Sequence, residues 1–169
     1  MPPIGASVQD KNKAAMLAML EAFNKRDPAV AAKLLSPKAR SDSTFPGNPQ
    51  LTKMAVAKRL PIEITRTSGG GATGPDVFPD GQYTVKELIA EGNKVILIWE
   101  MTGTHKGELF GRPATGKKVT VSGYEVVQFA NGKMVSHYDN HGTQTVLEVL
   151  AKVGQLDPAM MKQLGFAQG

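Results

Sequence analysis

Glu125 is well placed for acid/base chemistry, because it stands among apolar residues at alternate positions. Asn131-Gly132 is typical of a type I′ hairpin turn, which pairs Ala130 with Lys133. Carried along both strands, this register pairs Glu125 with Tyr138 and puts both on one face. The other residues of that face are mainly apolar and include Val119, Val121, Val127, Phe129 and Met134.

Burial of Glu125 on such a face would disfavour its charged form and raise its pKa, which suits a general acid or base. The alternative is that Glu125 is a surface residue, or a structural hydrogen-bond acceptor for Tyr138. Tyr138 in turn could donate a hydrogen bond to an enolate, or it could only satisfy Glu125. The pattern therefore makes Glu125 the first candidate catalytic residue.

The opposite face of the same hairpin is polar and holds Ser122, Tyr124, His137, Asp139 and His141. Two His and one Asp at alternate strand positions could bind a metal. A polar subunit interface or a solvated face is the competing interpretation, and we predict no metal site. A slip of one residue in the pairing would exchange the two faces. Asp139 and His141 would then line the pocket, so Asp139 is the second candidate acid.

His105 lies at the end of the most apolar strand-like stretch, residues 94–104. A pocket His could polarise a carbonyl group or shuttle a proton, whereas a loop His could simply cap backbone groups. The aromatic residues Trp99 and Tyr83 are interpreted as core or pocket wall. The candidate catalytic residues are thus Glu125, Asp139 and His105, and the candidate substrate contacts are Tyr138, Trp99, Tyr83, Tyr124, Asn140 and His141.

Hydrophobic periodicity and turn residues predict the elements that position these side chains. Met16, Leu20 and Phe23 recur at helical spacing, and Asp27-Pro28 is typical of an N-cap followed by the first helical residue. The expected helices are 10–25, a short one from 28, 50–60, one from about 146 with Thr145 and Glu148 at capping-box spacing, and a short one from 158. The expected strands are 39–45, 82–90, 94–104, 118–130 and 134–141, with a Gly-rich loop at about 67–79.

Helices followed by an antiparallel meander and a last helix predict an α+β layer fold. The length suits one domain over residues 1–169, with a flexible N-terminus of about nine residues. The strand 94–104 is apolar on both faces around Ile96 and Ile98, so we expect both faces to be covered. Helices would cover one face, and a second copy of the chain or a second sheet layer would cover the other. We expect a homodimer through the sheet.

Composition excludes several classes of protein. The net charge is +5, but Lys and Arg are scattered and do not interleave with aromatic residues, so we predict no nucleic-acid partner. Cys is absent, which excludes disulfides and Cys-based metal sites. No apolar run reaches the ~20 residues of a membrane span. We expect a cytoplasmic protein without a membrane partner, and a removed export leader is the alternative.

The second half of the chain also contains a series of longer motifs. They are Phe78-Pro79-Asp80, Leu88-Ile89-Ala90-Glu91-Gly92-Asn93-Lys94-Val95, Thr102-Gly103-Thr104-His105-Lys106-Gly107-Glu108-Leu109-Phe110-Gly111, Pro113-Ala114-Thr115-Gly116-Lys117 and Asn131-Gly132-Lys133-Met134-Val135-Ser136-His137-Tyr138-Asp139. In order and spacing, these motifs resemble those of the SnoaL-like polyketide cyclase (ester cyclase) family.

The resemblance implies the nuclear-transport-factor-2-like (NTF2-like) fold. This is a single cone-shaped, curved antiparallel sheet, also described as a cystatin-like α+β barrel, with N-terminal helices closing a cavity and a C-terminal helix. Members usually form dimers and bind polyketides. The resemblance also implies an acid/base role at the strand position of Glu125. Two positions differ from the family pattern: Tyr138, where Trp is frequent, and Gly142, where an acid is frequent.

We therefore predict a small-molecule enzyme that performs enolisation, aldol cyclisation or isomerisation on an apolar, cyclic substrate in an internal pocket. Glu125 would be the acid/base, while Tyr138 and His105 would polarise the substrate oxygen, and no cofactor is expected. The alternative is a non-catalytic protein that binds an apolar metabolite in the same cavity. A third hypothesis is an assembly domain whose cavity is filled by side chains.

Overall fold

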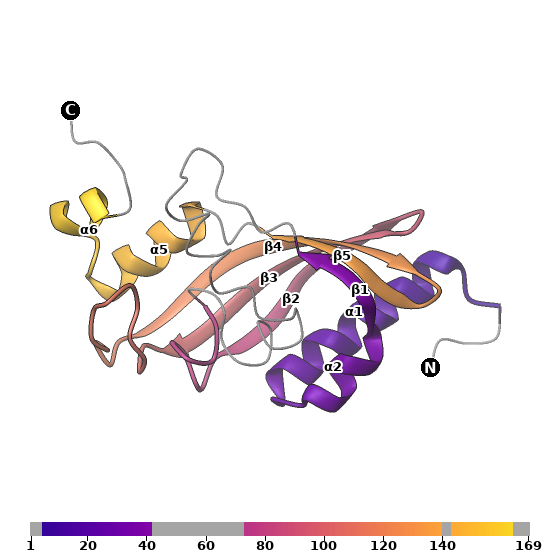
Figure 1. The fold of residues 1–169 in the computed structure, drawn as a ribbon, viewed down its shortest axis with the longest axis horizontal. Coiled ribbons are helices and arrows are strands. Elements are labelled where there is room, and N and C mark those ends of the chain that lie inside the picture. The colour runs from indigo at the N-terminus through magenta and orange to yellow at the C-terminus, as the bar shows by residue number, and fades with distance from the viewer. Residues whose placement is uncertain (1–4, 42–72, 140–142, 164–169) are drawn as a thin grey trace.

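The computed structural model describes residues 5–41, 73–139 and 143–163 of the chain (Figure 1). Helix α1, Val8–Asn24, begins with a capping box, in which the Ser7 side chain accepts the Asp10 N–H and the Asp10 carboxylate accepts the Ser7 N–H. Helix α2, Pro28–Leu34, follows at once. Its N-cap is Asp27, whose Oδ1 accepts two backbone N–H groups of the first turn at 3.0 and 3.3 Å. Both N-terminal helices are as predicted, although α1 begins two residues earlier.

Within the described residues, five strands form one sheet in the order β1-β5-β4-β3-β2. Their bounds are β1 Leu35–Ser41, β2 Gln82–Glu91, β3 Lys94–Thr104, β4 Lys118–Ala130 and β5 Lys133–Asp139. Strands β2 to β5 are antiparallel neighbours, whereas β1 runs parallel to β5. The sheet is therefore mixed and not wholly antiparallel. It is curved along its strands, and its two edge strands, β1 and β2, do not pair with each other (Figure 1).

Element bounds agree with the sequence most closely in the meander, where β3 and β4 have the predicted limits. Strand β1 begins four residues before the predicted start. Helix α5, Thr143–Val153, also begins earlier, so Thr145 lies inside its first turn and is not its cap. Helix α6, Pro158–Gln163, starts as predicted, and Asp157 Oδ1 accepts the Met160 N–H at 2.8 Å. The predicted helix 50–60 and the first part of the Gly-rich loop, residues 67–72, lie outside the described residues.

One face of the sheet is the buried face. Along β3 every second residue, from Val95 to Met101, is completely buried, and the residues between them are more exposed. Helix α1 packs on β2 and β3 and contributes Met16 and Met19 to the core, while α5 packs on β4. Helices α1 and α2 thus cover one end of the strands, and α5 and α6 lie toward the other end (Figure 1).

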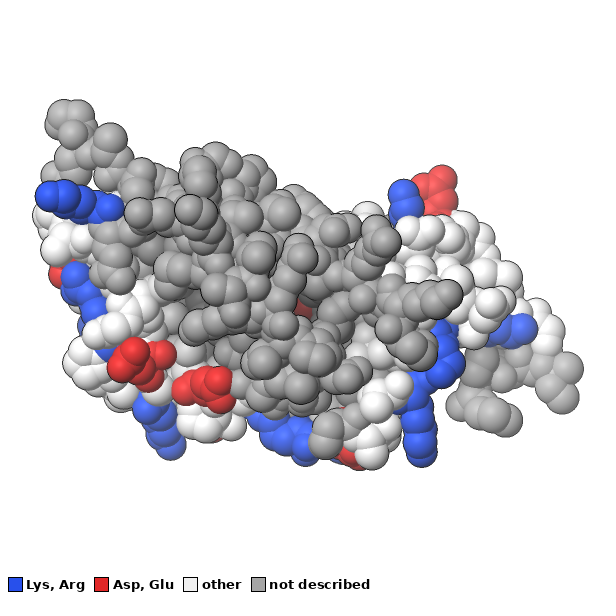
Figure 2. Space-filling model, viewed as in Figure 1, with Lys and Arg blue, Asp and Glu red and all other residues white. Residues whose placement is uncertain are grey.

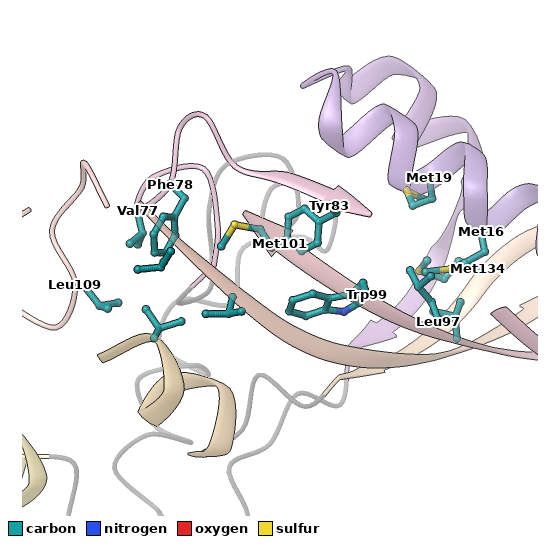
Figure 3. Close-up of a cluster of buried hydrophobic side chains, with 14 of the residues drawn as sticks. Met16, Met19, Val77, Phe78, Tyr83, Leu97, Trp99, Met101, Leu109 and Met134 are labelled. Carbon is teal, nitrogen blue, oxygen red and sulfur yellow. The ribbon is translucent and has the colours of Figure 1, made fainter. Parts of the chain in front are cut away.

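The buried side chains follow the length of β3 (Figure 3). Met16 of α1 lies near Leu97 at one end, Trp99 and Tyr83 lie in the middle, and Phe78 lies farther along. The interior therefore has two ends, one near Leu97 and one near Phe78, and residues at one end lie far from those at the other.

Among the described residues on the face drawn in Figure 2, Lys and Arg are dispersed and acidic residues lie between them. Among the described residues, none of the helices is both long enough and apolar enough to cross a membrane.

Candidate functional site

Glu125 lies on the buried face of the sheet, as predicted. It stands on β4 between the buried positions Gly123 and Val127, and its residue exposure is 9%. On the neighbouring strand β3 its partner is Leu97, which is completely buried. Trp99 is the partner of Gly123, so its ring belongs to the same stretch of the interior. Its inner-face neighbours along β4 and its partner on β3 are therefore not polar.

The pairing of β4 with β5 differs from the predicted register. Next to the turn, Phe129 pairs with Met134 as expected, but Gln128 then pairs with Ser136. Val135 is therefore an extra residue on β5, and this β-bulge shifts every later pair by one. A two-residue turn fixes the register only as far as the first bulge, and for that reason the predicted Glu125–Tyr138 pair is wrong.

The partner of Glu125 on β5 is Asp139, and the partner of Val126 is Tyr138. Directly opposite residues of an antiparallel pair belong to the same face. The register consequently assigns Asp139 to the buried face with Glu125, and Tyr138 to the other face. This is the one-residue slip that the sequence left open, and it joins the two candidate acids.

The structure does not place the other predicted site residues of the β4–β5 hairpin beside Glu125. Tyr124 lies on the outer face of β4 with 40% exposure, and its partner there is Ile98 of β3. Asn140 and His141 lie outside the described residues. Within the described part of the chain, no three His, Asp or Glu side chains are grouped as metal ligands.

Tyr83 and Trp99 form an aromatic wall beside this position. The Tyr83 and Trp99 rings are 5.0 Å apart in an edge-to-face arrangement, and Phe23 of α1 contacts Tyr83 in the same way at 4.9 Å. The Tyr83 hydroxyl donates to Thr73. The Asn24 side chain donates to the Tyr83 carbonyl and accepts its N–H, both at 2.8 Å, and so fixes the start of β2 against α1.

His105 is completely buried just after β3 and packs beside Phe78, with ring centroids 5.8 Å apart. Its Nδ1 lies 2.9 Å from Thr115 Oγ1 and accepts the Thr115 N–H at 3.3 Å. Burial lowers the pKa of His105, and an interaction with the Gly107 backbone opposes this shift in part. In the described part of the chain, His105 Nε2 has no hydrogen-bond partner.

Glu125 and His105 occupy different ends of the interior. The partner of Glu125 is Leu97, eight residues before His105 along β3. At ~3.3 Å per residue this is roughly 25 Å along the strand. The two groups therefore cannot polarise and deprotonate the same small part of a substrate, as the sequence had suggested.

Thr115 is a residue that the sequence analysis did not select, although it lies in the Pro113-Ala114-Thr115-Gly116-Lys117 motif. A threonine in a turn carries no signal for a contact with a His ten residues earlier. The only available signal was its place in a motif that accompanies the His105 motif.

Comparison with known proteins agrees with the fold and the motifs. The family model SnoaL-like polyketide cyclase matches residues 75–148. These residues include β2 to β5, Glu125, Asp139, His105 and Thr115. The resemblance seen in the sequence is thus confirmed over these residues. Among curated proteins, no sequence matches the chain significantly.

Solved structures extend the similarity over most of the chain. AclR from Streptomyces galilaeus, a candidate hydroxylase, is 28% identical with a TM-score of 0.66, and the match covers 88% of this chain and 99% of AclR. A candidate SnoaL-like polyketide cyclase from Jannaschia sp. CCS1 is 18% identical with a TM-score of 0.64, covering 90% and 97%. IdmH from Streptomyces antibioticus, a candidate polyketide cyclase, is 22% identical with a TM-score of 0.61, covering 83% and 98%. The chain therefore has the NTF2-like α+β fold.

Proposed function

We propose that the protein is a small-molecule enzyme of the cyclase or isomerase type, and that Glu125 is its acid/base. The observation that carries this proposal is the burial of Glu125 on an apolar sheet face, with Asp139 directly opposite on β5. Burial disfavours a charged carboxylate, which makes proton exchange near neutral pH easier. The similarity to candidate polyketide cyclases supports an apolar, cyclic substrate.

The chemistry needs only proton transfer and carbon–carbon bond formation. The Glu125 carboxylate removes a proton from a carbon next to a carbonyl group and leaves an enolate. In an isomerisation, Glu125 returns this proton to a different carbon. In an aldol closure, the enolate carbon bonds to a second carbonyl carbon, and the new alkoxide takes the proton from Glu125. Neither sequence consumes a further reactant, which agrees with the expectation that no cofactor takes part.

Asp139 is the second acid in this proposal. Directly opposite residues of an antiparallel pair have Cβ atoms about 4.5–5.5 Å apart. The register therefore places a second acidic residue directly across from Glu125. One acid would remove the proton and the other would donate one, as an enolisation requires.

Binding of small molecules can be followed through Trp99, the only Trp of the sequence and a buried neighbour of the Glu125 position. We would titrate the protein with fused-ring ketones, terpenoids and fatty acids and record Trp fluorescence and melting temperature. A ligand that binds only the folded protein raises the melting temperature. Turnover of a ketone class supports the enzyme. Tight binding without turnover would instead support a binding protein, and no binding in any class would contradict an internal pocket.

We also propose that a second copy of the chain covers the outer face of the sheet. Apolar residues lie there in paired positions: Ile89 opposite Ile96, and Ile98 opposite Tyr124. Ile89 is 44% exposed and Tyr124 is 40% exposed. An exposed apolar stripe across three strands is a typical association surface, and pairing it with an identical copy would remove it from water.

A further inference from the structure

The segment between β3 and β4, residues 105–117, begins with the buried His105 and returns to it at its end. The His105 N–H donates to the Lys117 carbonyl and the Gly116 N–H donates to the His105 carbonyl, both at 2.9 Å. These two bonds close the segment on itself directly at the end of the strands. Thr115 is thereby held next to the imidazole of His105.

The contacts of Nδ1 determine where the ring proton resides. The backbone N–H of Thr115 points at Nδ1 at 3.3 Å, so this nitrogen acts as an acceptor. The Thr115 hydroxyl, 2.9 Å away, can donate to the same atom, while its oxygen accepts the Lys117 N–H at 3.4 Å. A proton on Nδ1 would face the N–H of Thr115. A neutral imidazole carries one proton, and here it belongs on Nε2.

We infer that Thr115 is a positioning residue, which holds His105 as the neutral tautomer with its proton on Nε2. In this form Nδ1 is occupied, and the ring has no nitrogen with which to accept a proton from a substrate. His105 is therefore a hydrogen-bond donor and not a general base. The role of His105 as a donor, with proton transfer left to Glu125 and Asp139, agrees with the distance between His105 and these two acids. An oxygen atom of a bound molecule at this end of the interior would accept a hydrogen bond from Nε2–H.

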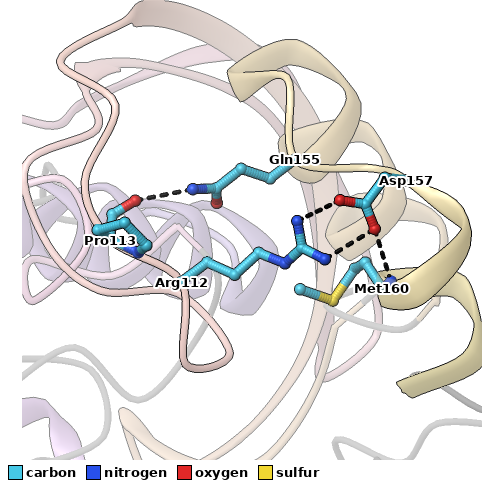
Figure 4. A network of polar contacts seen from close by, with 5 residues as sticks. All are labelled: Arg112, Pro113, Gln155, Asp157 and Met160. Atoms are coloured by element: carbon cyan, nitrogen blue, oxygen red, sulfur yellow. Dashed lines mark hydrogen bonds and ion pairs between the residues drawn. The ribbon is translucent and has the colours of Figure 1, made fainter.

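The loop that carries Thr115 is fastened to the C-terminal helices (Figure 4). Arg112 makes a bidentate ion pair with Asp157, one of whose contacts is 2.7 Å long. Gln155 donates to the Pro113 carbonyl at 2.7 Å. Both contacts lie within three residues of Thr115. The position of Thr115 therefore depends on the start of α6 as well as on the strands.

The tautomer can be measured directly by nitrogen-15 NMR of protein labelled at His, with a His105→Gln spectrum to assign the signals among the three His residues of the sequence. At neutral pH we expect a protonated Nε2 and an unprotonated Nδ1 in the wild type. Thr115→Val keeps the shape of the side chain and removes the hydroxyl. It should move the Nδ1 signal toward that of a nitrogen with a weaker hydrogen bond, and Thr115→Ser should restore it.

A protonated Nδ1 in the wild type would overturn the inference. An Nδ1 signal unchanged in Thr115→Val would do the same, because it would show that Thr115 only fills space. If Thr115→Val does not fold, the wild-type tautomer still decides. The measurement needs no substrate, and Glu125→Gln should leave the His105 signals unchanged. The inference can therefore fail while the proposed acid/base function stands, or the reverse.

Discussion

Glu125 takes a position in β4 whose inner-face neighbours include Leu97 and Val127, both completely buried. A buried ionisable group in an apolar setting is costly, and such groups cluster at functional sites. If Glu125 had only a structural role, its amide analogue would serve equally well. Replacing Glu125 with Gln therefore distinguishes a catalytic role from a structural one.

Glu125→Gln should lower turnover by about 10²- to 10⁴-fold, the usual contribution of a general acid or base. The fold should be retained, because Gln has the same shape and carries no charge into the core. Steady-state kinetics on a substrate from the ligand panel would measure the effect, and circular dichroism would confirm folding.

Glu100→Gln is the matched control, since Glu100 lies on the outer face of β3, opposite Ser122. It should leave turnover within about twofold of the wild type. Equal turnover in Glu125→Gln and the wild type would remove Glu125 from the mechanism.

At the scale of elements, the bulge at Val135 and the loop 105–117 decide which side chains meet. The bulge turns Asp139 rather than Tyr138 to the face of Glu125. The loop requires a very close approach of two backbones at Gly107, where a Cβ would stand 1.7 Å from the Asp76 carbonyl oxygen. Lys106 and Gly107 also both donate their N–H groups to Val77 at 3.0 Å.

Gly107→Ala should therefore destabilise the protein by roughly 3 kcal/mol or more, because backbone would have to move to admit the methyl group. Urea unfolding would measure the change. Gly111→Asn, in the same loop, is the control: Gly111 has φ +79°, nothing lies near its would-be Cβ, and Asn tolerates this conformation. Similar destabilisation in both variants would argue against the close approach.

The ion pair of Arg112 and Asp157 predicts a pH dependence of stability. Hydrogen bonds from Arg112 and from the Met160 N–H lower the pKa of Asp157 from 3.8 to about 2. A carboxylate with a depressed folded-state pKa stabilises the fold above its unfolded pKa. This contribution should be lost as the pH falls from about 4 to about 2.

Melting curves across that pH range should show a steeper loss of stability for the wild type than for Asp157→Asn. At neutral pH the variant should melt at a lower temperature than the wild type. Glu108→Gln, an exposed carboxylate of the same loop, is the control and should follow the wild type. Identical pH profiles for Asp157→Asn and the wild type would contradict the role of the pair.

At the scale of the whole molecule, the outer face of the sheet predicts self-association. Ile96→Lys places a charge in the middle of the apolar stripe, next to Ile89. We expect light scattering to give a dimer for the wild type and a monomer, or a dissociation constant raised by at least ~10-fold, for the variant. Leu17→Lys, an exposed apolar position on α1, should leave the dimer intact. A monomeric wild type would contradict the proposed interface.

The sequence by itself determined the class of fold and the limits of β3 and β4, and it favoured a buried position for Glu125. These features follow from local patterns: alternation along a strand, helical spacing around Met16, and turn residues such as Asn131-Gly132. Motifs with fixed spacing then showed the resemblance to the SnoaL-like family, whose model matches residues 75–148. Each of these patterns is local, because it can be read within a short stretch of the chain.

Only the tertiary structure decided which residues meet. A single extra residue at Val135 exchanged Tyr138 for Asp139 opposite Glu125. Strand length, at ~3.3 Å per residue, separated His105 from Glu125. A contact across a turn joined Thr115 to His105. Bulges and loop closures arise from packing between distant segments, and for that physical reason no local pattern in the sequence predicts them.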